Sequence, residues 1–493
     1  MKWNKSWPNP IYWPLSPFAK YFVRRLFVLL VACLAPPVQA DEAEAILTFL
    51  DHNQARFGAV AMDIWDYAEL GYLETKSSAR LQQVLVSGGF EIQAGVAGIP
   101  TAFVASFGKG KPVIGIVAEF DALPGISQSR SAIREILEDK HAGHACGHHL
   151  FGAGSTAAAI AVKQWLEGRR ISGTIRLYGT PAEEGGSGKV YMVRAGLFDD
   201  VDTVLHWHPA DRNSANASST LANKSARFKF TGVSAHAAAA PDRGRSALDA
   251  VEAMNYMVNL LREHVPQETR IHYIVSHGGE APNVVPDYAE SYYYVRHPNA
   301  GMLARIWDRV INIAESAAKG TETQVSIEVM HGNHSVLPNE ELSLLMHRNL
   351  TRVGGVHYDA EELAFAETLS ESLENNYVGM EKEVMPHELR QGMGSTDVGD
   401  ISWVVPTVGM RAATWVPGTA AHSWQAIAGG GTSIGTKGMT VAAKTLALTA
   451  RDLYLKPALI DAALQELDKR RGEYFQYEAL LGDRDPPLDY RIK

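Results

Sequence analysis

The feature that most constrains the fold is a regular alternation of helix-like and strand-like segments, which is interrupted once and then resumes. Between about residues 41 and 222, apolar runs such as 113–120 alternate with stretches of helical period such as the alanine-rich run 155–168. This alternation is typical of a largely parallel sheet with helices on both faces. We therefore predict an α/β domain.

A different order of segments occupies the middle of the chain. Between about 225 and 331 the pattern is strand, helix, strand, strand, helix, strand, which is the order of a ferredoxin-like two-layer domain. The alternating pattern returns from about 339, so we expect the smaller α+β unit to be inserted into the larger one. The predicted domains are 41–224 together with 339–455, the insertion 225–338, and a C-terminal extension 456–493. We expect that extension to be a helix followed by an exposed segment.

Residues 1–40 differ from the rest of the chain. Two arginines precede the apolar run 26–34, and Val38-Gln-Ala40 supplies the small residues at 38 and 40 that a signal peptidase needs. We predict a signal peptide and a periplasmic or secreted protein, because the run is shorter than the roughly 20 residues of a membrane-spanning helix. The alternative is a lipid anchor, since residues 30–33 resemble a lipobox in which Cys33 is acylated.

Charge and cysteine content exclude some functions. The formal net charge is −9, so no basic surface for nucleic acid is expected. The chain has 2 cysteines, and Cys33 lies in the export signal, so we expect no intramolecular disulfide. Cys146 stands between histidines, which suggests a metal ligand.

Five possible metal ligands fall within nine residues. They are His141, His144, Cys146, His148 and His149. The glycines at 143 and 147 leave the backbone free to fold imidazoles and a thiolate around one centre. These donors favour zinc, manganese or a neighbouring first-row ion over calcium or magnesium. The alternative is a helix start that is rich in histidine.

Two adjacent carboxylates, Glu183 and Glu184, follow the strand-like run 173–178. One such carboxylate can bind a metal while the other takes a proton from water and passes it to the leaving nitrogen. The alternative is an exposed pair on the surface, although two following glycines favour the edge of a cleft.

Three further histidines are candidates. His206 and His208 are two residues apart, so in an extended segment both leave the same face, and geometry does not choose between them. His422 lies in a loop of small residues.

Together these motifs resemble those of the M20 metallopeptidase family, in the amidohydrolase branch that includes indole-acetyl-amino-acid and p-aminobenzoyl-glutamate hydrolases. The resemblance covers nearly the whole mature chain. It rests on His144-Ala-Cys-Gly-His148, Pro181-Ala-Glu-Glu-Gly185 and Gly232-Val-Ser-Ala-His236. It implies a metal-dependent amidohydrolase that cleaves N-acyl or aroyl amino acids, p-aminobenzoyl-glutamate first and unusual dipeptides second.

The resemblance also implies a site of two divalent ions, Mn²⁺ or Zn²⁺. The implied ligands are Cys146 as the bridge, with His148, Glu184, His208 and His422. An alignment that uses His206 in place of His208 is the alternative. The histidines at 141, 144 and 149 then have supporting roles.

Other residues receive roles from the same resemblance. Glu183 would be the general base that activates water, and Asp121 would orient a ligand histidine. His236 and Asn283 of the insertion would polarise the scissile carbonyl and hold the oxyanion, often across the interface of a homodimer. Ser395 and Asp397, with Asn283, would contact the substrate.

The chain departs from the branch pattern in two places. His149 stands where many members have Asp, which could alter the preferred metal, and Gly394-Ser-Thr-Asp397 replaces Ser-Glu-Asp, which indicates a different substrate pocket. No implied ligand is missing, which favours an enzyme. The alternative is a non-catalytic subunit of a two-component hydrolase that contributes its lid to a related partner.

Overall fold

The computed structural model describes residues 1, 42–374 and 378–492. The predicted signal segment, with Cys33, lies outside the described residues apart from Met1. The chain divides into two compact units, residues 1–45 and 46–493, and the second contains every candidate residue of the site. Within the described residues, no helix has the length and apolar character needed to cross a membrane.

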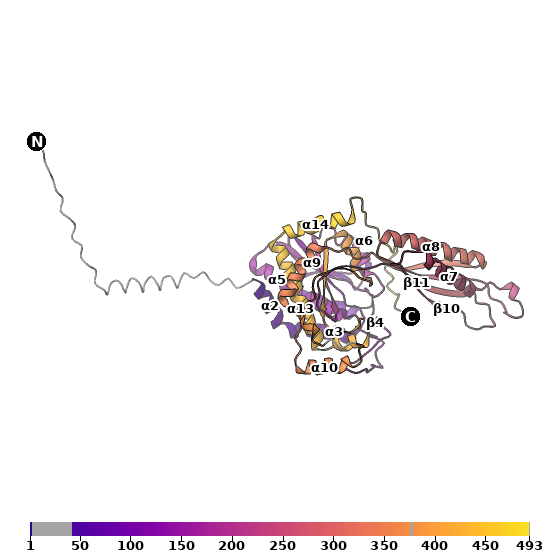
Figure 1. The fold of residues 1–493 in the computed structure, drawn as a ribbon, viewed down its shortest axis with the longest axis horizontal. Coiled ribbons are helices and arrows are strands. Elements are labelled where there is room, and N and C mark those ends of the chain that lie inside the picture. The colour runs from indigo at the N-terminus through magenta and orange to yellow at the C-terminus, as the bar shows by residue number, and fades with distance from the viewer. Residues whose placement is uncertain (2–41, 375–377, 493) are drawn as a thin grey trace. The chain divides into compact units, whose positions relative to one another are not determined.

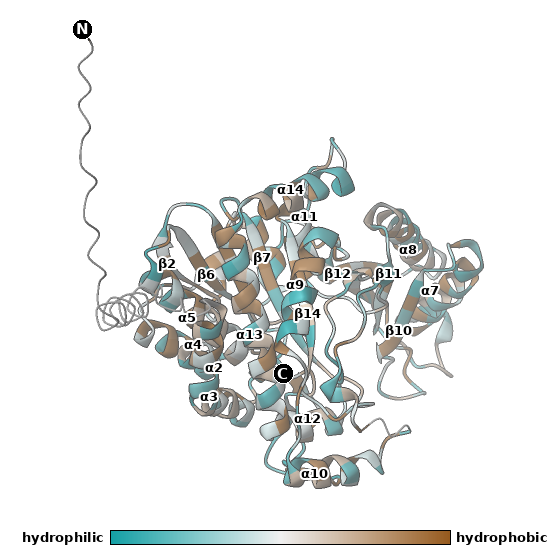
Figure 2. Ribbon diagram, turned by 60° about the vertical axis from the view of Figure 1, so that its left-hand side comes forward, coloured by the Kyte–Doolittle hydropathy of each residue, from teal (hydrophilic) through white to brown (hydrophobic). Residues whose placement is uncertain are grey.

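A six-stranded sheet forms the centre of the larger domain, in the order β1-β2-β6-β3-β7-β14. The strands are β1 Glu91–Ala94, β2 Phe103–Lys109, β3 Val113–Ala118, β6 Gly173–Gly179, β7 Thr203–Ala210 and β14 Thr407–Ala413. β6, β3, β7 and β14 are parallel, whereas β2 is antiparallel to both of its neighbours (Figure 2). β3 is buried along its whole length, as expected of a strand covered on both faces. The predicted mainly parallel α/β sheet is confirmed.

Helices flank this sheet (Figure 1), and α5 is buried over most of its length. α5 spans His148–Arg169 and is buried without interruption from His148 to Val162, as befits a helix packed on all sides. It begins earlier than the alanine-rich run predicted, because Gly147 turns the chain directly into the helix. His148 therefore lies in the first turn of a buried helix.

The other elements of the larger domain are these. The helices are α2 Glu42–His52, α3 Gln54–Tyr67, α4 Thr75–Ser87, α6 Gly188–Arg194, α9 Glu340–Val353, α10 Ala360–Ser370, α11 Val398–Val404, α12 Trp424–Gly430, α13 Ser433–Leu455 and α14 Ala458–Arg471. The short strands are β4 Leu123–Pro124, β5 Ala142–Gly143, β8 Ala217–Ser219 and β13 Leu389–Gln391. Single 3-10 turns are η1 Val96–Gly98 and η4 Met380–Lys382.

The inserted segment forms a two-layer domain with its own core. Its elements are β9 Ala222–Thr231, η2 Pro241–Arg243, α7 Ala247–Leu261, η3 Arg262–His264, β10 Arg270–His277, β11 Tyr288–His297, α8 Ala300–Gly320 and β12 Gln324–Asn333. The antiparallel sheet has the order β10-β11-β9-β12, and α7 and α8 pack on it around Phe228, Tyr293 and Trp307. The predicted order of strands and helices is confirmed.

The C-terminal extension differs from its prediction. The expected helix is present as α14, but the segment that follows it packs back onto the protein. Leu481 is 4% exposed, and the Arg484 guanidinium donates hydrogen bonds to the carbonyls of Val329 and Met330 in β12. Apolar and charged anchors along this segment hold it against the chain, which the expectation of an exposed end did not take into account.

Candidate metal centre

The residues singled out by the sequence lie at one edge of the six-stranded sheet. The parallel strands β6, β3, β7 and β14 end at this edge. In such sheets, ligands bind beside the carboxyl ends of the strands, where the loops meet. The edge carries Glu119 and Asp121 after β3, Glu183 and Glu184 after β6, His208 near the end of β7 and His422 after β14.

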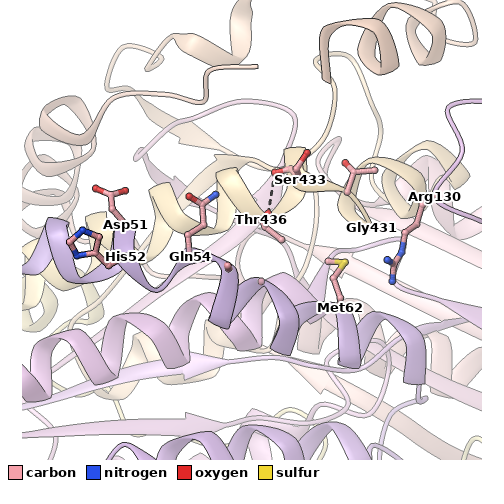
Figure 3. A pocket seen from close by; sticks show the side chains of 11 residues that line it. Asp51, His52, Gln54, Met62, Arg130, Gly431, Ser433 and Thr436 are labelled. Atoms are coloured by element: carbon pink, nitrogen blue, oxygen red, sulfur yellow. Dashed lines mark hydrogen bonds between the residues drawn. The ribbon is translucent and has the colours of Figure 1, made fainter. Parts of the chain in front are cut away.

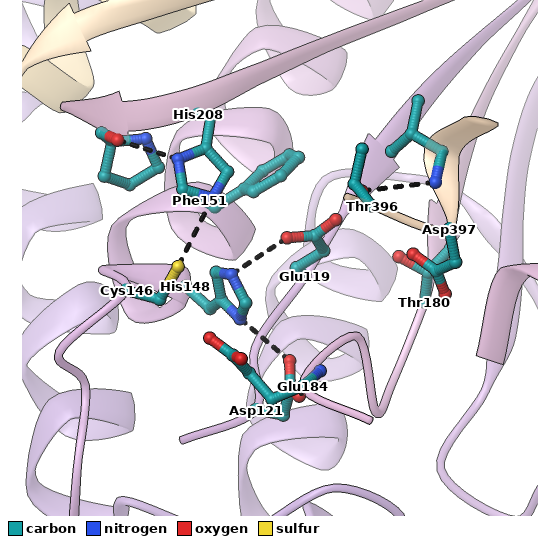
Figure 4. Close-up of polar contacts among 12 residues, drawn as sticks. Glu119, Asp121, Cys146, His148, Phe151, Thr180, Glu184, His208, Thr396 and Asp397 are labelled. Atoms are coloured by element: carbon teal, nitrogen blue, oxygen red, sulfur yellow. Dashed lines mark hydrogen bonds and ion pairs between the residues drawn. The ribbon is translucent and has the colours of Figure 1, made fainter. Parts of the chain in front are cut away.

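The first turn of α5 brings Cys146 and His148 to this edge. Gly147 precedes α5 with a φ of 80°, a conformation that glycine adopts without steric cost. A Cβ at Gly147 would lie 2.6 Å from the Cβ of Pro209, so the chain before α5 closely approaches the end of β7. Cys146 Sγ consequently lies 3.5 Å from His208 Nε2, and Figure 4 shows these side chains facing each other beside His148.

Two groups of potential ligand atoms share Cys146. The first is Cys146, His148 and His208, and the second is Cys146, Glu184 and His422. Within each group all ligand atoms lie within 4.8 Å of one another. Thiolate, imidazole and carboxylate together are donors for zinc and neighbouring first-row ions. The donor set therefore fits metal ions that share the thiolate.

Asp121 connects two of these candidate ligands (Figure 4). Its Oδ1 lies 2.9 Å from His148 Nδ1, and its Oδ2 accepts a hydrogen bond of 2.9 Å from the backbone N–H of Glu184. Such a carboxylate fixes the orientation of a metal-binding imidazole. His148 Nε2 lies 3.1 Å from Glu119 Oε2. Glu184 Oε1 in turn lies 3.2 Å from His422 Nε2. Within the described residues, the buried His148 Nε2 and Glu184 Oε1 have these ion-pair neighbours but make no hydrogen bond, so both atoms could bind a metal.

The centre concentrates negative charge in a buried place. Burial raises the pKa of Glu183 well above its ordinary value, and repulsion from Glu119 and Glu184 raises it further. Burial alone would lower the pKa of His148, but the charges of Cys146 and Glu119 outweigh it, so this pKa is raised. Positive charge bound among these groups would relieve the repulsion between the carboxylates.

The structure distinguishes between the two histidines of β7. Both leave the same face, but His208 is nearer the carboxyl end of the strand and reaches Cys146. Its Nδ1 lies 2.7 Å from the carbonyl of Pro209, which leaves Nε2 facing the centre. His206 instead packs against Gly409 of β14, where a Cβ would come within 2.2 Å of the imidazole. Burial lowers the pKa of His206 to about 3, so it is a neutral side chain packed between strands.

The remaining histidines of the cluster have other partners. His144 Nε2 lies 3.0 Å from the carbonyl of Ile64, and His149 Nε2 lies 3.0 Å from that of Gly430. Both imidazoles are buried and their centroids are 4.9 Å apart. They connect the ligand loop to α3 and α12, whereas His141 is exposed.

Sequence reasoning missed the buried Lys189. Its Nζ lies 2.7 Å from Glu119 Oε1 and 2.7 Å from Asp397 Oδ1, and all three side chains are almost fully buried. The signal was available, because Lys189 is a charged residue in the otherwise apolar stretch 188–193. Asp397, predicted to contact the substrate, has 0% exposure. Its carboxylate is engaged by Lys189, and its contact with substrate stays a prediction.

Ser395, the other predicted substrate contact in this loop, is half-buried. Its hydroxyl donates to the carbonyl of Leu221 at 2.8 Å and accepts a hydrogen bond from Arg296 Nη1 at 3.3 Å. Ser395 thus connects the loop before α11 to β9 and β11 of the inserted domain.

The structure brings His236 and Asn283 together on the inserted domain. The N–H of Ala237 donates to the carbonyl of Asn283 at 3.0 Å, and His236 Nδ1 accepts hydrogen bonds of 3.2 Å from Ala238 and Ala239. Both residues are exposed. In the described part of the chain, no hydrogen bond or ion pair joins either side chain to the candidate ligands, so their role in the reaction stays a prediction.

A cavity of about 690 Å³ lies away from this centre, against α3 and the start of α13 (Figure 3). It is lined by Asp51, His52, Gln54, Ala55, Gly58, Met62, Arg130, Gly431, Thr432, Ser433 and Thr436. None of these residues belongs to the ligand groups that share Cys146.

Comparisons with known proteins agree with this geometry. Residues 221–322 match a family model described as a peptidase dimerisation domain. The chain is 40% identical over 446 residues to one of the subunits of p-aminobenzoyl-glutamate hydrolase from Escherichia coli (strain K12), covering 85% of this chain and 93% of the relative. It is 30% identical over 437 residues to the Xaa-Arg dipeptidase of Mus musculus, covering 85% and 90%. A solved Bacillus subtilis dinuclear metal binding peptidase from the M20 family has a similar fold, with a TM-score of 0.53, 17% identity, and coverage of 81% and 99%.

Proposed function

Because this chain belongs to the M20 family of amide-bond hydrolases, we propose that it cleaves N-acyl or N-aroyl amino acids with the help of two divalent ions. The observation that carries this proposal is the pair of ligand groups that share Cys146. The first substrate to test is p-aminobenzoyl-glutamate, which the name of the 40% identical relative supports. Dipeptides with a C-terminal arginine come second, because the 30% identical relative is named for them.

We assign one ion to Cys146, His148 and His208 and the other to Cys146, Glu184 and His422. Mn²⁺ and Zn²⁺ are the first candidates, because the donors combine a thiolate with imidazoles. When bound, such ions polarise the scissile carbonyl and lower the pKa of water.

The chain's own residues carry the proton and orient the ligands. Glu183, Glu119 and His148 form a further group whose ligand atoms lie within 4.8 Å of one another. We assign Glu183 to the proton rather than to a metal, because neither of the two groups that share Cys146 includes it, and it acts as the general base. It takes a proton from the attacking water and returns it to the leaving nitrogen. Asp121 holds the imidazole of His148 and the backbone of Glu184 throughout.

The inserted domain supports a homodimer. Apolar side chains are exposed on α7 and on the edge strand β10, among them Tyr256 at 66% and Ile274 at 61%. An exposed edge strand with apolar side chains favours pairing with another copy. In such a dimer, we expect His236 and Asn283 of one protomer to act at the centre of the other.

Export remains part of this proposal and is tested separately. N-terminal sequencing of the mature protein distinguishes cleavage after residue 40 from processing at Cys33, and cell fractionation gives the compartment. Recovery of the full-length chain from the cytoplasm would contradict export.

The test of the reaction uses the purified mature protein. Bound metal is counted, and hydrolysis of p-aminobenzoyl-glutamate, N-acyl amino acids and dipeptides is measured with and without a chelator. We expect chelation to abolish hydrolysis, and Glu183→Gln to lower kcat by about 10²- to 10⁴-fold. Glu167→Gln, at a carboxylate that is 61% exposed, is the matched control. Hydrolysis that survives both chelation and Glu183→Gln would refute the proposal.

A second candidate follows from the name of the 40% identical relative, which describes it as one subunit of a hydrolase. In this case the chain acts only together with a related partner subunit. Against it, every predicted ligand and the general base are present. A pure chain that binds metal but hydrolyses nothing until a partner is added would favour this candidate.

A further inference from the structure

The loop that carries Glu183 and Glu184 is held by residues far away in the sequence. On one side, Glu74 Oε1 accepts a hydrogen bond of 2.8 Å from the N–H of Ala182. At its end, the Tyr72 hydroxyl donates to the carbonyl of Gly186 at 2.7 Å. Between these points, the carbonyl of Glu184 faces the end of the C-terminal extension.

Two residues of that extension bind the Glu184 carbonyl. Arg491 Nη2 donates a hydrogen bond to it, and the Tyr490 hydroxyl lies 3.4 Å from it. The two side chains support each other, because the Arg491 guanidinium lies 4.7 Å from the centre of the Tyr490 ring. The Tyr490 ring also packs edge-on against Tyr72, at 5.6 Å between centroids. Glu184 is thus held at both of its backbone groups, at the carbonyl by the Arg491 cation and at the N–H by Asp121.

Hydrogen bonds within the loop, such as that of 3.0 Å from the N–H of Gly186 to the carbonyl of Ala182, do not account for its whole backbone conformation. Ala182 has a φ of 59° and Ser187 a φ of 58°, and residues with a side chain keep this left-handed conformation only where the surroundings impose it. Space around the loop is also tight, since a Cβ at Gly71 would lie 2.4 Å from the Tyr490 hydroxyl and 2.9 Å from Ala182 Cβ.

The extension reaches the loop along an anchored path. Leu481 is buried, and Arg484 is bound to β12 of the inserted domain. Arg194 of α6, the helix that follows the loop, donates to the carbonyls of Asp483 and Arg484 at 3.2 and 2.7 Å. These contacts fix the path of the extension. Tyr490 and Arg491 are thereby placed beside the carbonyl of Glu184.

We propose that Tyr490 and Arg491 are positioning residues of the active site. By fixing the peptide of Glu184, they set the direction of its carboxylate toward His422 and of the neighbouring Glu183 carboxylate toward the substrate. The proposal rests on the proposed function, because turnover is one of its measurements.

The test compares Arg491→Ala, Arg491→Lys and Tyr490→Phe with Tyr477→Phe. The control removes a hydroxyl from the same extension, where Tyr477 binds Asp400 at 2.8 Å and does not touch the loop. We expect Arg491→Ala to lower kcat by about 10- to 100-fold, because a small misplacement of catalytic groups has effects of this size. The KM of Arg491→Ala should change by less than about threefold. Arg491→Lys should recover part of the lost kcat, and the kcat of Tyr490→Phe should lie between those of the two Arg491 variants.

A second measurement does not depend on turnover. Co²⁺ is titrated into the apoprotein, and the thiolate-to-cobalt absorption reports the ions at Cys146. We expect Arg491→Ala to weaken the binding of the ion assigned to Glu184 and His422 at least about fivefold and to leave the other ion unchanged.

Three results would overturn the proposal. They are a kcat within about threefold of the unmodified protein together with an unchanged cobalt titration, a rise in KM alone, or an equal loss in Tyr477→Phe. A rise in KM alone would make Arg491 a substrate-binding residue. An equal loss of kcat in the Tyr477→Phe control would mean that any change in the extension loosens the structure. If the unmodified protein hydrolyses nothing, the proposed function fails, whereas the cobalt titration still decides the positioning role.

Discussion

Replacing Lys189 by methionine keeps much of the side chain's length but removes the ammonium group that faces two carboxylates. Lys189 has 0% exposure, and its Nζ lies 2.7 Å from both Glu119 Oε1 and Asp397 Oδ1. Removing one member of a buried ion pair typically destabilises a protein by about 3–5 kcal/mol, because the partner charge is left uncompensated. Two carboxylates lose their cation here, so we expect a loss at the upper end of this range.

The assay is urea unfolding of the apoprotein, followed by tryptophan fluorescence, at several pH values. The cation of Lys189 favours the charged form of Glu119, although burial dominates and leaves the pKa of this carboxyl raised. Without Lys189 the pKa of Glu119 rises further, so lowering the pH protonates Glu119 and reduces the penalty. The destabilisation should therefore be largest at high pH and shrink as the pH falls.

Lys229→Met is the matched control for this experiment. Lys229 forms an ion pair of 2.7 Å with Glu328, and the two side chains are 35% and 44% exposed. Such exposed pairs contribute about 0.2–1 kcal/mol. If Lys189→Met costs no more than Lys229→Met, or if its cost does not depend on pH, the buried cation does not stabilise this site.

Two further predictions concern other residues of the centre. His208→Ala should remove one of the two bound ions in a metal count, whereas His206→Ala should lower the unfolding free energy and keep both ions; loss of metal in both variants alike would contradict the assignment. Burial and the charge of Asp121 raise the pKa of Glu74 from 4.5 to about 8, so between these values the folded state holds a proton that the unfolded state releases. Stability should fall as the pH rises through this window, and Glu74→Gln should flatten that fall in urea unfolding; an unchanged slope would refute the effect.

The sequence predicted the architecture well, because the two units differ in the order of their segments. Alternating segments predict a parallel sheet, and the six-segment block predicts a two-layer domain, without knowledge of any contact. The start of α5 was harder, since the alanine-rich run indicated a later beginning. A glycine with positive φ at Gly147, and not the helix propensity of the residues after it, decides where this helix begins.

The candidate ligands were predictable as a set but not as an arrangement. The choice between His206 and His208 depends on how far β7 extends toward the edge of the sheet. The alternation of side chains along a strand does not reveal where the strand ends. The ion pair between Asp397 and Lys189 was not predictable either, because Lys189 lies more than two hundred residues earlier. The path of the C-terminal extension likewise depends on tertiary contacts that no local pattern encodes.

The position of the insertion between β7 and β14 has a consequence for the order in which the centre can form during synthesis. Cys146, His148 and His208 all precede the inserted domain, whereas His422 follows it. A chain that emerges from the ribosome therefore has one complete group of donors long before the strand that leads to His422 exists. The donors of the two halves are therefore synthesised at different times, and the set for the second ion is completed only after the inserted domain has been made.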